Sequence, residues 1–299
     1  MRVVLSDWDG VWFSSEVAKA VRWYFSAMCL KGDPEISQAF IEQIAKRNPE
    51  ARKKSETLIE SRWEDIQTTM QFSGGRRIDF AMRTYHHFID PNADEKLVEE
   101  KMYPLAEPIR EILIEWFSTP IFENLKFFER LAMELDRTYW DKHPLGLITQ
   151  TESSALDKQF NLSDTSGRNI WGKFRNLLSR FGPYIPGKGF PHTECAGDYK
   201  EKFPHLKGKE KTTAYKILCA KKGVRPEETI TFEDTEDGVR AAKGAGIVCI
   251  GIKPINSNQD LYLADLVITG SLECLIDFVD LFVFEDSQKV IERIKEFLP

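Results

Sequence analysis

Five short runs of apolar residues lie along the chain, at residues 2–7, 144–149, 229–234, 247–252 and 264–269. Within each run the apolar residues mostly follow one another instead of alternating with polar ones, which is typical of strands covered on both faces. Helical patterns precede three of the four later runs. Strands that alternate with helices predict a parallel sheet wound by right-handed crossovers. We therefore expect an open, Rossmann-like α/β core.

Residues 15–119 follow a different pattern. They contain no convincing strand and several amphipathic helical segments, among them EVAKAVRWYFSAM, EISQAFIEQIAKR and PIREILIEWF. The chain has 299 residues, which is enough for two domains that each bury a core. We predict a helical domain at residues 15–119, inserted into an α/β core made of residues 1–14 and 120–299.

A second interruption is predicted inside the α/β core, at about residues 152–208. This region is rich in Gly, Pro, Ser and Asp, and it contains one helical stretch around RNIWGKFRNLLSRF. Long connections without regular structure are uncommon and usually functional. The region is expected to be an irregular insertion that forms a wall, a lid or an oligomer contact, and the sequence does not choose among these or predict an oligomeric state.

Composition narrows the class of partner. The net charge of −6 argues against a general binder of nucleic acid or of anionic membranes. No apolar run reaches the roughly 18 residues that span a bilayer. The five cysteines are odd in number, scattered and without metal-type spacing, and no signal peptide is expected before Asp7. We expect a cytoplasmic protein with reduced thiols.

Acidic and hydroxyl side chains stand where the predicted strands end. Asp7 ends the first strand, Thr149 the second, and Glu233 and Asp234 the third. Open α/β sheets bind their ligands beyond the carboxyl ends of the strands, so these groups converge if the three strands are neighbours. Carboxylates that share one crevice repel one another, and Mg²⁺ with a substrate phosphate is the usual compensation. The sequence therefore predicts a Mg²⁺ site that takes a phosphorylated ligand.

Four segments together resemble the ordered motifs of the haloacid dehalogenase superfamily. They are DWDGV (7–11), LITQT (147–151), a lysine ahead of TTAYKILCAKKG, and ITFEDTEDGVRAAKGAGI (230–247). The resemblance covers the α/β core, is much weaker across the helical insertion, and is to the group of phosphoglycolate phosphatases and β-phosphoglucomutases. It implies a Rossmann-like core with an inserted helical cap and Mg²⁺-dependent transfer of a phosphoryl group.

The resemblance also implies roles for the first two motifs. Asp7 would be the nucleophile that forms an aspartyl-phosphate. Asp9 would protonate the leaving alcohol and then activate water. Thr149 would donate a hydrogen bond to the phosphoryl oxygens, and the neighbouring Gly10 and Gln150 would take part in binding the substrate.

The metal would be held by Asp7, by the backbone carbonyl of Asp9, by Asp234 and by Glu233, with Asp237 as a further outlying carboxylate. The lysine that neutralises the phosphoryl group is Lys209 by the spacing of phosphoglycolate phosphatases and phosphoglucomutases, which we favour. It is Lys211 by the shorter spacing of phosphoserine phosphatases.

One segment of the helical insertion, FSGGRRIDF (72–80), resembles the stretch by which caps of this group present an arginine to the distal anionic group of the substrate. The spacing from Gly74 selects Arg77. A guanidinium suits a phosphate or a carboxylate because it donates two parallel hydrogen bonds.

The presence of Asp9 indicates a phosphate ester as the substrate and not a halide, because a general acid is required only for a poor leaving group such as an alkoxide. We predict a Mg²⁺-dependent phosphatase of a small phosphorylated metabolite, with no nucleic acid or membrane as partner. The first alternative is a phosphomutase; Glu152 stands where β-phosphoglucomutases have a lysine, which favours the phosphatase. The second alternative is a non-catalytic module that binds a phosphorylated ligand.

Overall fold

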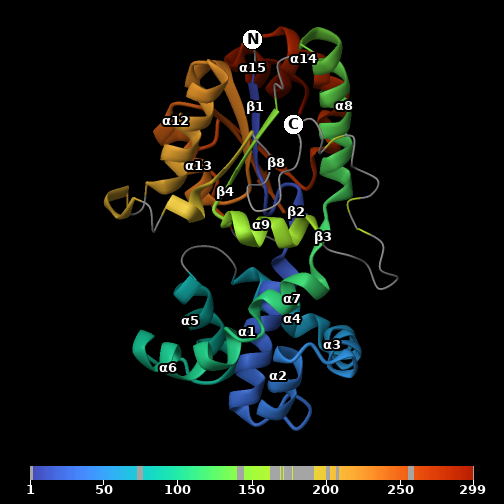
Figure 1. The fold of residues 1–299 in the computed structure, drawn as a ribbon, viewed down its shortest axis with the longest axis vertical. Helices are drawn as coiled ribbons and strands as arrows, with labels where there is room; N and C mark the ends of the chain where they lie inside the picture. Colours follow the sequence, from blue (N-terminus) through green and yellow to red (C-terminus); the bar gives the residue numbers. More distant parts are fainter. Residues whose placement is uncertain are drawn as a thin grey trace. The chain divides into compact units, whose positions relative to one another are not determined.

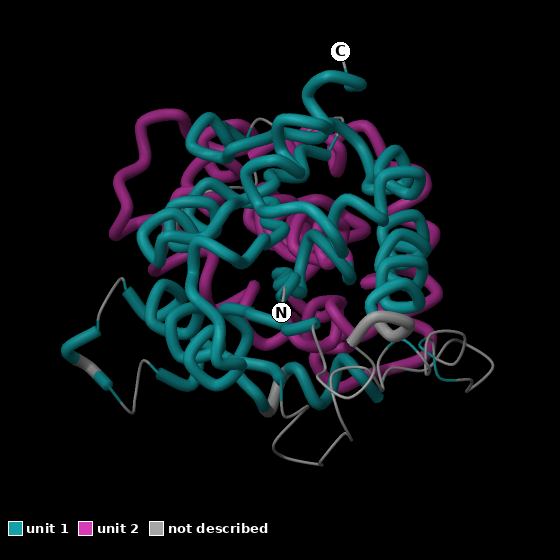
Figure 2. Tube along the Cα trace, turned by 90° about the horizontal axis from the view of Figure 1, so that it is seen from above, with its two compact units in different colours: residues 1–13, 120–255, 259–299 teal, residues 14–119, 256–258 magenta. Residues whose placement is uncertain are grey.

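The computed structural model describes residues 3–72, 77–139, 145–161, 169, 171, 177, 192–199, 203–206, 209–254 and 259–298. The chain divides into two compact units, which are coloured separately in Figure 2. Unit 1 comprises Met1–Phe13, Pro120–Ile255 and Gln259–Pro299, and unit 2 contains Ser14–Thr119.

Unit 1 is built on a six-stranded sheet in which every pair of neighbours is parallel. From one edge to the other the strands are β5 (Thr193–Cys195), β4 (Leu145–Thr149), β1 (Val3–Asp7), β6 (Thr229–Glu233), β7 (Val248–Lys253) and β8 (Leu266–Thr269). All five predicted strands are present, with bounds that differ by at most two residues. The predicted α/β class with a Rossmann-like parallel sheet is confirmed.

Helices cover both faces of this sheet (Figure 1). On one face α12 (Glu210–Lys222) and α13 (Glu236–Ala245) pack on β1 and β7 through buried side chains such as Leu5, Leu218 and Cys249. On the other face Phe232 of β6 meets α8 (Phe122–Tyr139) and α14 (Val279–Phe284); the ring centroids of Phe127 and Phe232 are 5.4 Å apart. Successive strand residues point to opposite faces, so the neighbours of Phe232 face α12.

The remaining elements of unit 1 complete its outer layer. They are α9 (Ser153–Phe160), α15 (Ser287–Phe297) and the short 3₁₀ helices Ala196–Asp198, Pro204–Leu206, Pro226–Glu228 and Leu272–Phe278. In α15 Val290, Ile291 and Ile294 are buried, whereas Phe297 is largely exposed.

The region 152–208 differs from its prediction. Its described part contains α9, the edge strand β5 and two of the 3₁₀ helices, so it is not wholly irregular. Strand β5 has only three residues, Thr-Glu-Cys, and pairs with β4. With three residues it is too short to carry an apolar run. Apart from Asn169, Trp171 and Leu177, the predicted helical stretch 168–181 lies outside the described residues.

Unit 2 is formed by helices. In chain order they are α1 (Glu16–Lys31), α2 (Gln38–Ala45), α3 (Pro49–Ser61), α4 (Trp63–Gln71), α5 (Arg77–Phe88), α6 (Glu95–Ala106) and α7 (Arg110–Phe117). Two short strands, β2 (Phe13–Ser14) and β3 (Thr119–Pro120), pair where the chain passes between the units.

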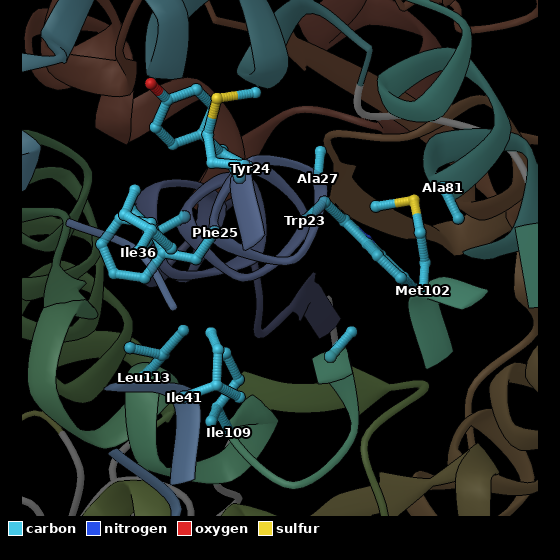
Figure 3. Packing of buried hydrophobic residues seen from close by; sticks show 14 of the residues in the cluster. Trp23, Tyr24, Phe25, Ala27, Ile36, Ile41, Ala81, Met102, Ile109 and Leu113 are labelled. Atoms are coloured by element: carbon cyan, nitrogen blue, oxygen red, sulfur yellow. The ribbon is translucent and has the colours of Figure 1, made fainter. Parts of the chain in front are cut away.

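Helix α1 is the centre of unit 2. Every residue from Ala20 to Met28 is buried, and Figure 3 shows Trp23, Tyr24, Phe25 and Ala27 projecting from α1 in different directions into one apolar cluster. A helix that is buried all round packs against several neighbours at once. No helix in the described part of the chain is long and apolar enough to cross a membrane.

Candidate active site

Asp7 occupies the carboxyl end of β1, between β4 and β6 in the middle of the sheet. Its register partner on β4 is Ile148, one residue before Thr149. The side chain is buried and accepts a hydrogen bond of 2.9 Å from the backbone N–H of Trp8. Because the three central strands end together, Asp7, Thr149 and Glu233 lie on adjacent strand ends, as the placement of polar groups in the sequence predicts.

Lys211 connects two of these strand ends. Its Nζ lies 2.9 Å from Oδ2 of Asp7 and 2.8 Å from Oε1 of Glu233, and its side chain is only 4% exposed. Tyr215, one helical turn further along α12, hydrogen-bonds Glu233 and also Thr231 at 3.0 Å. Residues four apart share one face of a helix, so α12 presents both polar groups to the end of β6.

The preference for Lys209 needs correction. The sequence placed the start of the helix at the Thr212–Thr213 pair, which left both lysines in the segment before it. The helix instead begins at Glu210, and Lys209 is its exposed N-cap residue. Lys211 therefore lies in the first helical turn, on the face that packs against the sheet, and Lys209 points to solvent.

Burial and charge shift the pKa values in this cluster. Burial raises the pKa of Asp7 above its usual range, although the Lys211 ammonium opposes the shift. Burial likewise raises the pKa of Glu233 to about 7. Burial alone would lower the pKa of Lys211, but the carboxylates of Asp7 and Glu233 outweigh it and the net pKa is raised. The lysine is therefore held as an ammonium beside two carboxyl groups.

Three carboxyl groups are close enough to hold a metal ion. One oxygen each from Asp7, Glu233 and Asp234 lies within 4.8 Å of the other two, and all three residues are buried. Several carboxylate oxygens with room for water and phosphate form a donor set that fits a hard divalent cation. We call Asp7, Glu233, Asp234 and Lys211 the carboxylate cluster.

Two glycines make room for these carboxylates. Gly10 has a φ of +84°, and a Cβ on it would lie 1.7 Å from Oδ2 of Asp234. A Cβ on Gly238 would lie 1.9 Å from Oε2 of Glu233. The first motif therefore packs directly on the fourth. Gly10, which the resemblance links to substrate binding, here has a packing role against Asp234.

The other predicted residues of unit 1 are spread around the cluster. Thr149 is buried, and its Oγ1 accepts a hydrogen bond of 3.0 Å from the N–H of Thr151. Asp9 is partly buried, and Gln150 is exposed at the end of β4. Asp237 is exposed in the first turn of α13. Among the described residues, the carboxyl groups close enough to share a metal ion are those of Asp7, Glu233 and Asp234, without Asp237.

Two tryptophans anchor the segment that follows β1, and the sequence does not reveal their partners. Trp8 is fully buried and donates from Nε1 to Oε1 of Gln159 in α9 at 2.6 Å. Trp12 donates to Oγ of Ser6 at 2.8 Å and stacks on Phe128, which assigns it to the core and not to a surface facing substrate. No sequence signal links Gln159 to this loop, because 151 residues separate it from Trp8.

Arg77 belongs to unit 2. It begins α5 and forms an ion pair with Glu107, which follows α6. Its guanidinium lies over the ring of Tyr103, 4.8 Å from the centroid.

Comparison with known proteins places this fold. No family model matches the chain. The validoxylamine A 7′-phosphate phosphatase of Streptomyces hygroscopicus subsp. limoneus is 36% identical over 67 residues, which are 22% of this chain and 32% of that protein. The chain thus spans about a third of the length of this curated relative.

Solved structures match over nearly the whole chain. A haloacid dehalogenase (HAD) family hydrolase from Deinococcus radiodurans R1, with bound phosphate and sodium, superposes with a TM-score of 0.53 at 16% identity, covering 96% of this chain and 98% of that one. A β-phosphoglucomutase from Pyrococcus sp. strain ST 04 gives a TM-score of 0.49 at 14% identity, with 95% and 99% covered. The resemblance predicted from the four motifs is confirmed: this chain has the fold of the haloacid dehalogenase family hydrolases.

Proposed function

We propose that this chain is a Mg²⁺-dependent phosphatase that hydrolyses a small phosphomonoester through an aspartyl-phosphate on Asp7. The observation that carries the proposal is the carboxylate cluster at the ends of adjacent strands, with a lysine between the nucleophile and a metal-competent acid. Phosphoryl transfer needs positioning and charge neutralisation above all, and this cluster offers both.

The chemistry follows from the residues present. A carboxylate oxygen of Asp7 bonds to phosphorus while the bond from phosphorus to the ester oxygen breaks. Asp9 gives its proton to the departing alkoxide, then takes a proton from the water that cleaves the aspartyl-phosphate. Lys211 neutralises negative charge beside Asp7, and Thr149 donates a hydrogen bond to the phosphoryl group.

Asp7, Glu233 and Asp234 would hold the Mg²⁺ ion together with the backbone carbonyl of Asp9. When bound, the ion supplies positive charge that neutralises the transferring phosphoryl group. The ion also explains why three buried carboxyl groups are tolerated so close together, because their mutual repulsion is otherwise costly.

Unit 2 is proposed as the helical cap that selects the substrate, and the partner as a small phosphorylated metabolite. The curated relative is named as a phosphatase of a phosphorylated metabolite, which supports this class. A cytoplasmic location is proposed because the five cysteines are odd in number and scattered, as is usual for reduced thiols. The phosphatase is favoured over a mutase because Glu152, an exposed residue before α9, replaces the lysine of the mutases.

The test is a panel of phosphomonoesters, with release of inorganic phosphate measured in Mg²⁺ and in EDTA. We expect activity in Mg²⁺ only, and a loss of about a thousandfold or more in Asp7→Asn, because the nucleophile is removed. Asp280→Asn, which neutralises an exposed acid of α14 in unit 1, is the matched control and should keep its activity.

Three results would contradict the proposal. Activity that survives Asp7→Asn would exclude Asp7 as the nucleophile. A sugar bisphosphate that accelerates isomerisation of a sugar phosphate, without being consumed to inorganic phosphate, would identify a mutase. Binding of tungstate without any release of phosphate would identify a non-catalytic module.

A further inference from the structure

Trp8 joins the proposed nucleophile to a helix far along the chain. Its backbone N–H donates to Oδ1 of Asp7 at 2.9 Å, and its indole Nε1 donates to Oε1 of Gln159 in α9 at 2.6 Å. Trp8 is fully buried and Gln159 is 8% exposed, so both groups of the second bond are shielded from solvent. One residue therefore bonds Asp7 through its backbone and α9 through its side chain.

The two carboxylate oxygens of Asp7 have different partners. Oδ1 accepts from the N–H of Trp8, and Oδ2 lies 2.9 Å from Nζ of Lys211. The terminal torsion of an aspartate is broad, so a carboxylate held at one oxygen alone can still turn. A nucleophile has to point its attacking oxygen at phosphorus, and a small misplacement costs a large factor in rate. The bond from Trp8 is therefore part of what aims the carboxylate of Asp7.

The sheet does not set the position of Trp8. Strand β1 ends at Asp7, and Trp8 begins the turn that follows it. Two later residues of the same segment donate to the carbonyl of Trp8, but such bonds hold the shape of the turn and not its place in the fold. The far end of the turn is tied by Asn124, which donates to the carbonyl of Val11 at 2.8 Å. The near end, beside Asp7, is tied by the indole of Trp8 to Gln159.

Gln159 is itself held in place by a second tryptophan. Nε1 of Trp171 donates to the backbone carbonyl of Gln159 at 3.0 Å, and Trp171 is buried. Asn169 links Trp171 to the end of α9, because it accepts from the N–H of Trp171 at 2.8 Å and donates to the carbonyl of Phe160 at 3.0 Å. The acceptor for Trp8 therefore comes from a residue whose own backbone is fixed.

Aromatic rings pack around the indole of Trp8 without fixing its N–H. The ring centroids of Phe160, Trp171 and Phe13 lie 4.5, 4.8 and 5.6 Å from that of Trp8. Ring contacts tolerate several relative orientations, whereas a hydrogen bond weakens steeply once its angle departs from linear. The rings therefore bury Trp8, and Gln159 orients it.

We propose that Gln159 is a positioning residue for the nucleophile: it holds the indole of Trp8, and the backbone N–H of Trp8 in turn holds the carboxylate of Asp7. The inference rests on the proposed function, in which Asp7 attacks phosphorus. Gln159 acts on the rate of that attack and leaves the binding of substrate to other residues. An amide suits this position because it accepts from an indole without adding a negative charge to a unit that already buries three carboxyl groups at one site.

The test measures how fast Asp7 is phosphorylated, with p-nitrophenyl phosphate as the probe in Mg²⁺. With the enzyme in excess, stopped-flow absorbance follows the release of nitrophenolate in a single turnover, which reports the attack of Asp7 on phosphorus. Nitrophenolate is a good leaving group, so its release does not depend on a proton from Asp9. We expect this rate to fall about tenfold or more in Gln159→Met, with the half-saturating enzyme concentration within about twofold of the wild type.

Methionine has about the length of glutamine, so Gln159→Met removes the acceptor and keeps most of the packing. Asn161→Leu is the matched control. It exchanges an amide for an apolar side chain at an exposed position directly after α9, where the amide donates to the carbonyl of Asp157 at 2.8 Å. The single-turnover rate of Asn161→Leu should equal that of the wild type.

A double variant shows whether Gln159 acts through Trp8. Trp8→Phe keeps a ring and removes the indole N–H, so it breaks the same bond from the other side, and Trp63→Phe makes this change at a partly exposed tryptophan as its control. We expect the double variant to be about as slow as the slower single variant, because one bond can be lost only once. A loss in the double variant that equals the product of the two single losses would overturn the proposal.

Melting temperatures separate positioning from a purely structural role, and each rate is measured well below the melting temperature of the variant. Should Gln159→Met fail to fold, Trp8→Phe and the double variant, which leaves neither partner unsatisfied, carry the same test. A folded Gln159→Met with a lower melting temperature and the rate of the wild type would assign Gln159 to the fold alone and overturn the proposal. A wild type that releases no nitrophenolate would refute the proposed function, and this inference with it.

Discussion

Among the described residues, unit 1 buries a group of carboxyl groups, whereas the buried charge of unit 2 is that of Arg22. In unit 1 three carboxyl groups share one lysine, which leaves a net charge of −2 if all are ionised. In unit 2 the buried Arg22 lies 3.8 Å from Glu107, which also pairs with the exposed Arg77. Burying charge is costly unless it is paired, so the carboxylate cluster is not explained by folding alone.

The difference lies in how each group is assembled. The carboxyl groups stand at strand ends, where the backbone of a parallel sheet fixes their spacing. Arg22 and Arg77 stand on separate helices, and both guanidinium groups lie over the ring of Trp23. A site whose spacing the backbone fixes suits a small cation with strict geometry.

After Asp7→Asn, the largest effect expected in the carboxylate cluster is that of Lys211→Met. The change removes the ammonium between Asp7 and Glu233 and leaves two buried carboxyl groups without it. We expect kcat/KM to fall about a hundredfold or more. The measurement is steady-state kinetics on whichever phosphomonoester the panel identifies.

Lys209→Met is the matched control, because Lys209 lies two residues away, carries the same charge and is exposed. Its kinetics should stay within about twofold of the wild type, as is usual for surface charges. A loss of activity in Lys209→Met as large as that in Lys211→Met would contradict the assignment to Lys211. It would favour Lys209 as the phosphate-binding lysine, as the spacing of phosphoglycolate phosphatases predicts.

The next effect is that of Gly10→Ala. A Cβ at this position collides with the carboxylate of Asp234, so the variant must displace a proposed metal ligand. We expect the Mg²⁺ concentration for half-maximal activity to rise about tenfold or more. Gly32→Ala is the matched control. Gly32 has a left-handed φ of +82°, close to that of Gly10, but a Cβ there would meet no described atom within 4 Å.

Gly32→Ala should therefore show only the cost of a left-handed backbone, about 1–2 kcal/mol of stability, with Mg²⁺ dependence unchanged. Equal Mg²⁺ dependence in Gly10→Ala and the wild type would mean that Asp234 does not hold the ion.

The smallest effect expected is on the pH dependence of stability without metal. Glu233 has a pKa raised to about 7 in the folded chain, against 4.5 for an unperturbed glutamate. Between these values the folded state holds more protons than the unfolded state, so stability falls as pH rises from 4.5 to 7. The loss is at most about 3 kcal/mol and is measured by urea unfolding in EDTA.

Glu233→Gln should flatten this dependence, whereas Glu194→Gln, which changes another buried carboxyl group paired to a lysine of unit 1, should retain it. In unit 2 the pKa shift of Arg22 has the opposite sign, because burial lowers this pKa to about 9. The free energy of unfolding therefore increases as pH rises above 9, where the folded chain has released the proton and the unfolded chain still holds it. A steep loss of stability in Glu233→Gln between pH 4.5 and 7 would contradict the assignment to Glu233.

Much of the fold could be predicted because the sheet is parallel and buried. Its strands are continuous apolar runs that end at polar residues, and the pattern located five of the six. Strand β5 was not predicted because its three residues, Thr-Glu-Cys, are too few to form an apolar run. The catalytic roles of Asp7, Asp9 and Thr149 stay predictions, but their place at strand ends could be read from the sequence because a strand end is a local feature.

The sequence by itself determined the α/β class, the strand ends and the residue types that resemble the haloacid dehalogenase motifs, since these depend on short-range patterns. Only the tertiary structure showed that Lys211 contacts Asp7, because α12 begins at Glu210, ahead of the Thr212–Thr213 pair, and carries Lys211 on the side that faces the sheet. It alone brought Gln159 to Trp8, and Arg22 and Arg77 to the same Glu107. Such pairings depend on how distant helices pack, and no local pattern of polar and apolar residues encodes them.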